Sequence, residues 1–224
     1  MSAIWLFKPW LPYKIGLFEW SQQCSFVNRE ELSRARPAPD TFAPADFPTA
    51  RLELLLEYFC ADCFLSNSFV LVSQDLRDAM ALGPQNVQYL PVDASLSAPL
   101  PRSKNYMIMH VPVIENVADV DQSDYMFRHM PGGSKSVLAV WSIAMRRDAS
   151  RKHELFRDAF FQKHIFCTDE FAVRVLQRKC TGLRFLDLRY LGREPAHFRT
   201  LDGIEEGEWD LVQKQHYSNM VQPM

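Results

Sequence analysis

The chain has 224 residues, which is long enough for one large domain or two small ones with a hydrophobic core. Hydrophobic residues at 47% and charged residues at 23% are ordinary proportions for a globular protein. The formal net charge of −2 gives no general attraction to nucleic acid or to an anionic membrane, and no apolar run approaches the roughly 18–20 residues that span a bilayer. We therefore expect a globular protein whose partner is neither nucleic acid nor a membrane.

Two short aromatic and aliphatic runs, residues 4–8 and 15–20, open the chain and are separated by prolines and a glycine. This pattern predicts two strands joined by an irregular turn. Because the start has no basic region and no small-residue cleavage site, we interpret it as folded protein rather than an export signal. The odd number of cysteines, without disulfide-framework spacing, indicates reduced thiols in a cytoplasmic protein. The cysteines are Cys24, Cys60, Cys63, Cys167 and Cys180.

A proline-rich stretch follows at residues 34–48. Because proline fixes φ and removes a backbone donor, we predict a loop or strap across the surface here. Residues 49–65 place apolar side chains at helical spacing behind Thr49, which is suited to cap a helix. We predict a helix for this segment, with a buried strand as the alternative that its run of leucines and aromatics leaves open.

Residues 69–92 have the pattern of a strand, a cap, a helix, a turn and a second strand. Ser73 ends a β-branched run and is placed to accept hydrogen bonds from the first turn of a helix. Gly83-Pro84 would end that helix, and the alternation around Tyr89 predicts a half-buried strand.

The same plan recurs at residues 165–188. Thr168 takes the capping position, acidic residues fill the first turn and Gly182 suits a left-handed exit from the helix. We therefore predict two related strand–helix–strand units. Aligning the units with one extra residue at the turn places Ser73 on Thr168 and Tyr89 on Phe185.

The region between the two units is predicted to be mostly extended. Residues 93–104 form a polar connector, and residues 106–117 are typical of a strand bent at its proline. Residues 119–125 are acidic and predict a turn. Residues 131–135 predict a hairpin tip, after which residues 136–144 return as a strand.

No set of residues completes a known catalytic or metal-binding pattern. Cys60 and Cys63 have the CxxC spacing, but no second pair or HxxxH completes a zinc site, so we interpret them as buried structural thiols. Residues 131–136 fail the spacing of a phosphate-binding loop, and the aspartates of residues 119–125 lack the glycine and glutamate of a calcium loop. We predict no catalytic residue, no cofactor and no metal.

Five segments carry a family resemblance: Val70-Leu71-Val72-Ser73, Asp119–Tyr125, Leu155-Phe156-Arg157, Ile165–Thr168 and Cys180–Phe185. Together they resemble a bacterial toxin-immunity family of polymorphic-toxin and type VI secretion loci, long catalogued as a domain of unknown function. In that family a strand–serine–helix–glycine–strand unit closes the domain after a short Phe-Arg strand. The resemblance covers about residues 60–190, and this chain departs from it in having Thr168 where serine is usual.

We predict an α+β fold, organised as a single domain over residues 1–224. Two pseudo-repeated strand–helix–strand halves, about 1–100 and 101–190, would form a mainly antiparallel sheet, with residues 191–224 as a C-terminal extension. The resemblance implies an immunity protein that binds a cognate antibacterial toxin and occludes its active site.

The predicted toxin contact is the acidic turn together with the exposed tip beyond it, because acidic side chains would mimic the anionic substrate of a basic toxin. The candidate residues are Asp119, Asp121, Asp124, Tyr125 and Arg128.

Two other classes of function stay open at this point. One is a small hydrolase or transferase with a cysteine nucleophile and a histidine base, since sequence does not show which residues are close in space. The other is a structural or regulatory binding module without a toxin partner. A homodimer is also left open. The residues of the enzyme alternative are Cys167 or Cys180 with His153, His164 or His197.

Overall fold

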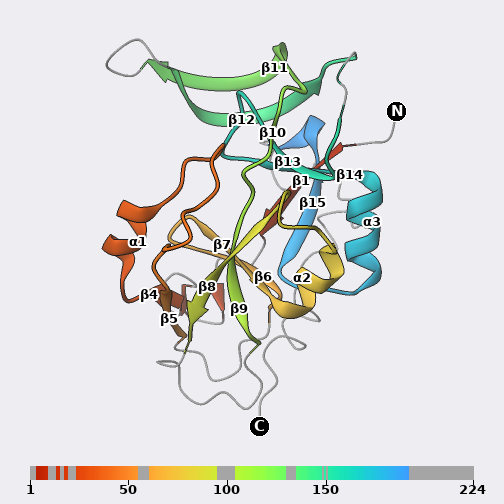
Figure 1. Cartoon of the computed structure of the whole chain (residues 1–224). Helices are drawn as coiled ribbons and strands as arrows, with labels where there is room; N and C mark the ends of the chain where they lie inside the picture. Colours follow the sequence, from red (N-terminus) through yellow and green to blue (C-terminus); the bar gives the residue numbers. More distant parts are fainter. Residues whose placement is uncertain are drawn as a thin grey trace.

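The computed structural model describes residues 4–9, 14–15, 18–19, 24–54, 61–94, 104–129, 135–147, 149 and 151–191. Within them, short helices lie among many strands, which confirms the α+β class (Figure 1). The helices are α1 (Arg29–Ala35), α2 (Gln74–Met80), α3 (Asp169–Gln177) and the 3-10 helix η2 (Leu188–Tyr190). The strands are β1 (Ile4–Pro9), β2 (Lys14–Ile15), β3 (Phe18–Glu19), β4 (Cys24–Phe26), β5 (Ala50–Leu54), β6 (Cys63–Ser66), β7 (Phe69–Ser73), β8 (Gln88–Asp93), β9 (Tyr106–His110), β10 (Ile114–Glu115), β11 (Ala118–His129), β12 (Lys135–Met145), β13 (Leu155–Asp158), β14 (Ile165–Thr168) and β15 (Leu183–Asp187).

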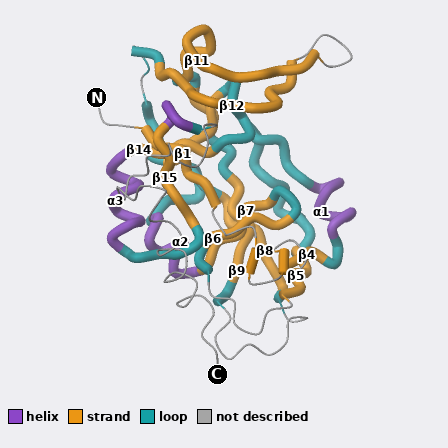
Figure 2. The backbone as a smooth tube through the Cα atoms, turned by 180° about the vertical axis from the view of Figure 1, so that it is seen from behind, coloured by secondary structure: helices purple, strands orange, loops and turns teal. Residues whose placement is uncertain are grey.

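Two larger sheets form the body of the molecule. One has the strand order β4-β5-β8-β9-β7-β6, and the other has the order β10-β13-β14-β1-β15. Neighbouring strands are antiparallel except for the pairs β5 with β8 and β10 with β13, so the predicted mainly antiparallel arrangement is confirmed for the described strands. Helices α2 and α3 lie side by side at one edge of the body (Figure 2).

The two strand–helix–strand units have the same topology. In each unit a preceding antiparallel strand pairs with the strand before the helix, which gives the orders β6-β7-β9-β8 and β13-β14-β1-β15. The two strands that flank the helix are not neighbours, because one strand from elsewhere in the chain lies between them. That middle strand is β9 in the first unit and β1, from the start of the chain, in the second.

The pairing registers reproduce the alignment predicted from the sequence. Ser73 and Thr168 both pair with the first residue of a middle strand, and Tyr89 and Phe185 both pair with its fourth residue. The pairs are Ser73 with Tyr106, Thr168 with Ile4, Tyr89 with Met109, and Phe185 with Phe7.

Both helices begin at the predicted capping residues. The Oγ of Ser73 accepts a hydrogen bond from the backbone N–H of Leu76 at 3.1 Å, and the Oγ1 of Thr168 accepts one from Phe171 at 3.3 Å. Each bond satisfies one of the free N–H groups of a first helical turn. Two residues after α3 adopt a positive φ. Lys179 is the first, just after the helix, and the predicted Gly182 is the second, where the chain turns into β15.

A buried carboxylate joins the two units. Asp62 is 3% exposed, and its Oδ1 accepts hydrogen bonds from Ser73 at 2.6 Å and from the Nζ of Lys104 at 2.5 Å. Its Oδ2 accepts the backbone N–H of Thr181 at 2.8 Å. A Cβ on Gly182 would lie 2.1 Å from the carbonyl oxygen of Cys63, so the backbones of the two units meet here.

One core cluster contains side chains from both sheets and from both helices α2 and α3. At its centre Phe7, Phe171 and Phe185 pack edge to face, with ring centroids 5.9–6.5 Å apart. Such pairs contribute about 0.5–1.5 kcal/mol each beyond the apolar area that they bury. The two sheets therefore share one core.

The helix predicted for residues 49–65 is wrong. Ala50, Leu52 and Leu54 are buried and alternate with Arg51 and Glu53, which is the two-residue period of strand β5. The strand alternative holds here, while residues 55–60 lie outside the described part.

The first two predicted strands do not pair with each other. β1 pairs with β14 and β15, and the second run forms the short strands β2 and β3, which pair together. Residues 36–49 contain neither helix nor strand, as their prolines predict, but α1 just before them was missed. The predicted bend in residues 106–117 is confirmed as the gap between β9 and β10.

No helix in the described part of the chain is long and apolar enough to cross a membrane. Most of the connector at residues 93–104 and the extension after residue 191 lie outside that part.

Candidate partner-binding surface

Strands β11 and β12 form a long antiparallel hairpin that is separate from both large sheets and lies across one end of the molecule (Figure 1). The acidic segment 119–125 was predicted as a turn, but it lies within β11. Its turn-forming residues appear instead as a bulge, because Asp119 lies opposite Ala144 whereas Asp124 lies opposite Ser142. The predicted tip at residues 131–135 falls between the two strands in the sequence, and residues 130–134 lie outside the described part.

Asp119 accepts two hydrogen bonds that stabilise the bulge. Its Oδ1 accepts the backbone N–H of Gln122 at 3.2 Å, and its carbonyl oxygen accepts the hydroxyl of Ser123 at 2.6 Å. The same hydroxyl oxygen accepts the N–H of Ala144 at 3.0 Å and so links the bulge to β12. Among the described residues no group of three or more acidic, histidine or cysteine side chains is arranged to hold a metal ion.

The five predicted contact residues divide between two faces of the hairpin. Asp121, Asp124 and Arg128 are exposed, and Asp124 and Arg128 share the outward face of β11 with Met126, which is 47% exposed. Tyr125 lies on the opposite face and packs its ring against Phe160 and Phe161, with centroids 5.1 and 5.6 Å apart. The structure therefore leaves the charged residues accessible and uses Tyr125 to hold the hairpin to the body.

Asp158 fixes the base of the hairpin. It is 1% exposed, and its Oδ2 accepts the backbone N–H groups of Val117 at 3.0 Å and Ala118 at 2.9 Å, where β11 begins. Its Oδ1 accepts those of Phe160 at 2.8 Å and Phe161 at 3.2 Å. Sequence reasoning missed this residue. An aspartate just before a chain reversal does signal the local bonds, but nothing in the sequence indicates the bonds to β11.

A groove of about 530 Å³ lies between β12 and the loop at residues 159–164. Apolar side chains of the hairpin and the loop line most of it, and Leu138 in its wall is 51% exposed. None of the residues that line it is acidic. The lining residues are Pro39, Ser136, Val137, Leu138, Ala139, Val140, Ala159, Phe160, Phe161, Gln162, Lys163 and His164.

Two groups in or beside this groove have lowered pKa values. Burial, together with the charges of Lys8, Lys163 and Arg157, holds the pKa of His164 below its ordinary value. Burial, with Arg36 nearby, lowers the pKa of Arg157 to about 10. Desolvation is the larger cause of both shifts, and neighbouring cations add to it.

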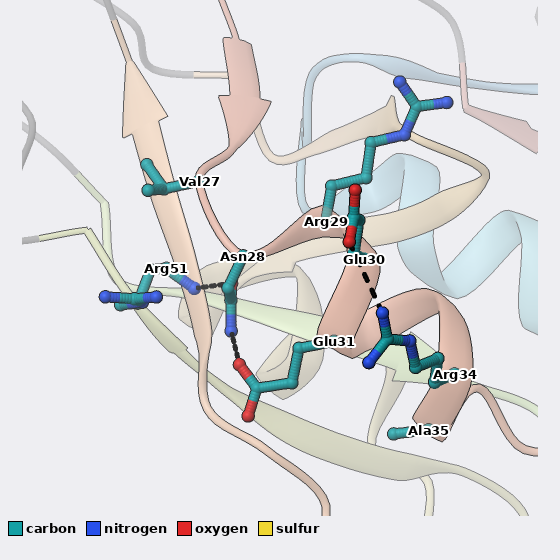
Figure 3. Close-up of a pocket in the computed structure, with 8 residues that line it drawn as sticks. All are labelled: Val27, Asn28, Arg29, Glu30, Glu31, Arg34, Ala35 and Arg51. Carbon is teal, nitrogen blue, oxygen red and sulfur yellow. Dashed lines mark hydrogen bonds and ion pairs between the residues drawn. The ribbon is translucent and has the colours of Figure 1, made fainter.

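A second recess, of about 830 Å³, lies beside α1 (Figure 3). Its charged side chains partly compensate one another, since Arg34 pairs with Glu30 at 3.5 Å. The amide of Asn28 is used structurally: its Nδ2 donates to Glu31 at 2.9 Å and its Oδ1 accepts the backbone N–H of Arg51 at 2.9 Å. We regard this recess as a weaker candidate than the hairpin because several of its polar groups bond to one another.

Three thiols whose side chains the structure describes, Cys63, Cys167 and Cys180, have raised pKa values. Burial raises the pKa of Cys63 and Cys167 well above the ordinary thiol value and raises that of Cys180 to about 11. A catalytic cysteine needs a lowered pKa, so that its thiolate is present at neutral pH. These side chains therefore fit packing better than catalysis. Cys60 and His197, from the CxxC and Cys–His hypotheses, lie outside the described residues.

Comparison with known proteins gives one family. Residues 20–189 match the model of the Immunity protein family (Imm11), a span that includes the hairpin, the groove and both strand–helix–strand units apart from β1. No curated protein matches the chain.

Proposed function

The chain belongs to the Imm11 family of immunity proteins, and we propose on this basis that it binds a cognate antibacterial toxin and neutralises it by covering the toxin's active site. The family match carries the proposal, because it spans residues 20–189 and so most of the folded body. We place the protein in the cytoplasm of a bacterium with a polymorphic-toxin or type VI secretion locus, where a toxin would need to be neutralised.

The β11–β12 hairpin is the surface that we assign to the toxin. Asp121 and Asp124 are exposed on it, and exposed carboxylates fit a basic active site that accepts an anionic substrate. Arg128 and Met126 lie beside Asp124 on the same face, and apolar and Arg side chains supply most of the binding energy in many interfaces. Tyr125 and Asp119 contribute indirectly by holding the strand in place.

The mechanism that we propose is steric and electrostatic, without a catalytic residue, cofactor or metal. Asp158 and the aromatic packing fix the hairpin before the toxin arrives. A fixed surface loses less conformational entropy on binding than a flexible one, so more of the contact energy appears as affinity.

Co-expression with the toxin encoded next to this gene tests the proposal. The wild-type protein should restore growth and should co-purify with the toxin. Replacing the two exposed carboxylates together, Asp121→Asn with Asp124→Asn, should weaken binding by about tenfold or more, because charge pairs at an interface contribute to both affinity and association rate.

A matched double variant, Asp46→Asn with Glu170→Gln, removes the same charge from exposed sites away from the hairpin and should bind as the wild type does. Absence of any binding or rescue by the wild type would refute the proposed function. Equal binding by both double variants would refute only the acidic contact.

A further inference from the structure

The groove between β12 and residues 159–164 combines apolar side chains with one lysine. Val137, Leu138 and Val140 from the hairpin and Phe160 from the loop all line it. Lys163 is exposed at its edge, and His164 also lines it. A mixed lining of this kind suits a ligand that is itself apolar on one side and anionic on the other.

Neither Arg157, beside the groove, nor Lys163, in its lining, has an acidic partner within the described residues. Arg157 donates from its Nε to the carbonyl oxygen of Val111 at 3.0 Å and from its Nη1 to that of Gln162 at 2.6 Å. These bonds orient the guanidinium and the loop without neutralising the charge. No ion pair is found for Lys163 in the described part of the chain.

His164 adds an unused polar atom. Its Nδ1 is buried and has no hydrogen-bond partner among the described residues. The ring lies between Phe161 and Phe166, with centroids 6.5 Å from each, so it is held in place. A buried polar atom without a partner is destabilising, so a hydrogen bond from a ligand to this nitrogen would be favourable.

We propose that this groove receives a segment of the toxin in which an acidic side chain lies next to an apolar one. The apolar side chain would pack against Leu138 and Phe160, and the carboxylate would pair with Lys163 at the edge. This inference rests on the proposed function, and it adds a second contact of opposite charge to the acidic outward face of the hairpin.

Two contacts of opposite charge would also fix the orientation of the toxin. Asp121 and Asp124 lie towards the base of β11, whereas Lys163 lies beside the part of β12 nearer the tip. A toxin that has a basic active site and an acidic neighbouring segment fits both in one orientation, while a reversed approach would bring like charges together.

Photo-crosslinking from the groove tests the contact directly. A benzophenone amino acid replaces Leu138, which is 51% exposed in the groove wall, and in a control it replaces Val173, which is 41% exposed on α3. The protein is mixed with the toxin encoded next to its gene and the crosslinked toxin peptide is identified by mass spectrometry. We expect a crosslink from position 138, to a peptide with Asp or Glu within about two residues, and none from position 173.

A charge reversal gives an independent measurement. Lys163→Glu should weaken toxin binding by about tenfold or more and should reduce the salt dependence of the association rate. Lys152→Glu makes the same charge change at an exposed residue that does not line the groove, and should change the affinity less than about twofold.

The outcomes separate the two proposals. If the wild type binds the toxin but Lys163→Glu binds equally well and position 138 gives no crosslink, the groove contact is wrong and the proposed function stands. A crosslink to a toxin peptide without an acidic residue also overturns the contact as stated. If the wild type does not bind the toxin at all, both proposals fail together.

Discussion

Replacing Asp158 by asparagine tests whether one carboxylate holds the hairpin to the body. The substitution keeps the size of the side chain but turns one acceptor oxygen into an amide donor, so two of the four backbone N–H groups now at 2.8–3.2 Å lose their acceptor. Each buried N–H without a partner costs about 1–3 kcal/mol, so we expect the free energy of unfolding to fall by about 4 kcal/mol. Urea-induced unfolding measures this loss.

The control is Asp121→Asn, an exposed change in the same hairpin that should alter the free energy of unfolding by less than about 0.5 kcal/mol. Hydrogen exchange adds a local measurement, because the amides of Val117 and Ala118 should lose protection in Asp158→Asn beyond the global loss. A fall of less than about 1 kcal/mol in Asp158→Asn, with native protection at both amides, would show that the carboxylate does not hold the hairpin.

Three further variants test other parts of the fold. Gly182→Ala should lower the free energy of unfolding by about 3 kcal/mol or more, since φ is +79° and a Cβ would lie 2.1 Å from the Cys63 carbonyl oxygen; an unchanged urea midpoint would contradict this. Ser73→Ala should lower the free energy of unfolding by more than the roughly 1 kcal/mol expected for Thr168→Ala, because Ser73 both caps α2 and donates to a buried carboxylate. Equal losses in the two variants would count against a contribution from the hydrogen bond to the carboxylate. Burial lowers the pKa of His110 in the folded state. Its contribution to stability is therefore full above the unfolded pKa of about 6.5 and is lost as the pH falls below that value. His110→Gln should flatten the fall in unfolding free energy between about pH 7 and pH 5, and an unchanged slope would refute the assignment.

The strand–helix–strand units were predictable because their signals are local. The capping hydroxyls of Ser73 and Thr168, the apolar helix faces and the alternation around Tyr89 act within about twenty residues of one another. Side-chain period and capping are set by backbone geometry that neighbouring residues determine. The register then followed, since both units place equivalent residues opposite the same positions of a middle strand.

The strand order was not predictable from those signals. Nothing in residues 4–8 indicates that β1 lies between β14 and β15, about 160 residues away. The helix predicted for residues 49–65 was wrong for a related reason. A run rich in leucine fits both the helical and the strand spacing of apolar residues. The pairing of β5 with β4 and β8 makes the segment a strand.

The candidate site likewise has features that local sequence signals predict and features that depend on distant contacts. The exposure of Asp121 and Asp124 agrees with their polar sequence, but the role of Tyr125 in packing depends on two phenylalanines more than thirty residues later. The groove was missed altogether, because its apolar side chains come partly from β12 and its lysine comes from the loop after β13. A surface formed by segments far apart in the sequence has no characteristic residue spacing from which it could be predicted.

If the hairpin binds the toxin as proposed, its attachment and its charges should make separable contributions to the affinity. Asp158 is buried and joins the start of β11 to the loop after β13, so it acts on the population of the fixed hairpin. Asp124 is exposed and acts only through what it touches. Loss of Asp158 should therefore weaken binding mainly by adding an ordering step before the complex forms, and stabilising osmolytes should restore part of the affinity. Loss of Asp124 should weaken binding by an amount that salt reduces and osmolytes leave unchanged. A salt-sensitive, osmolyte-insensitive defect in Asp158→Asn would mean that this carboxylate contributes charge to the interface rather than order to the hairpin.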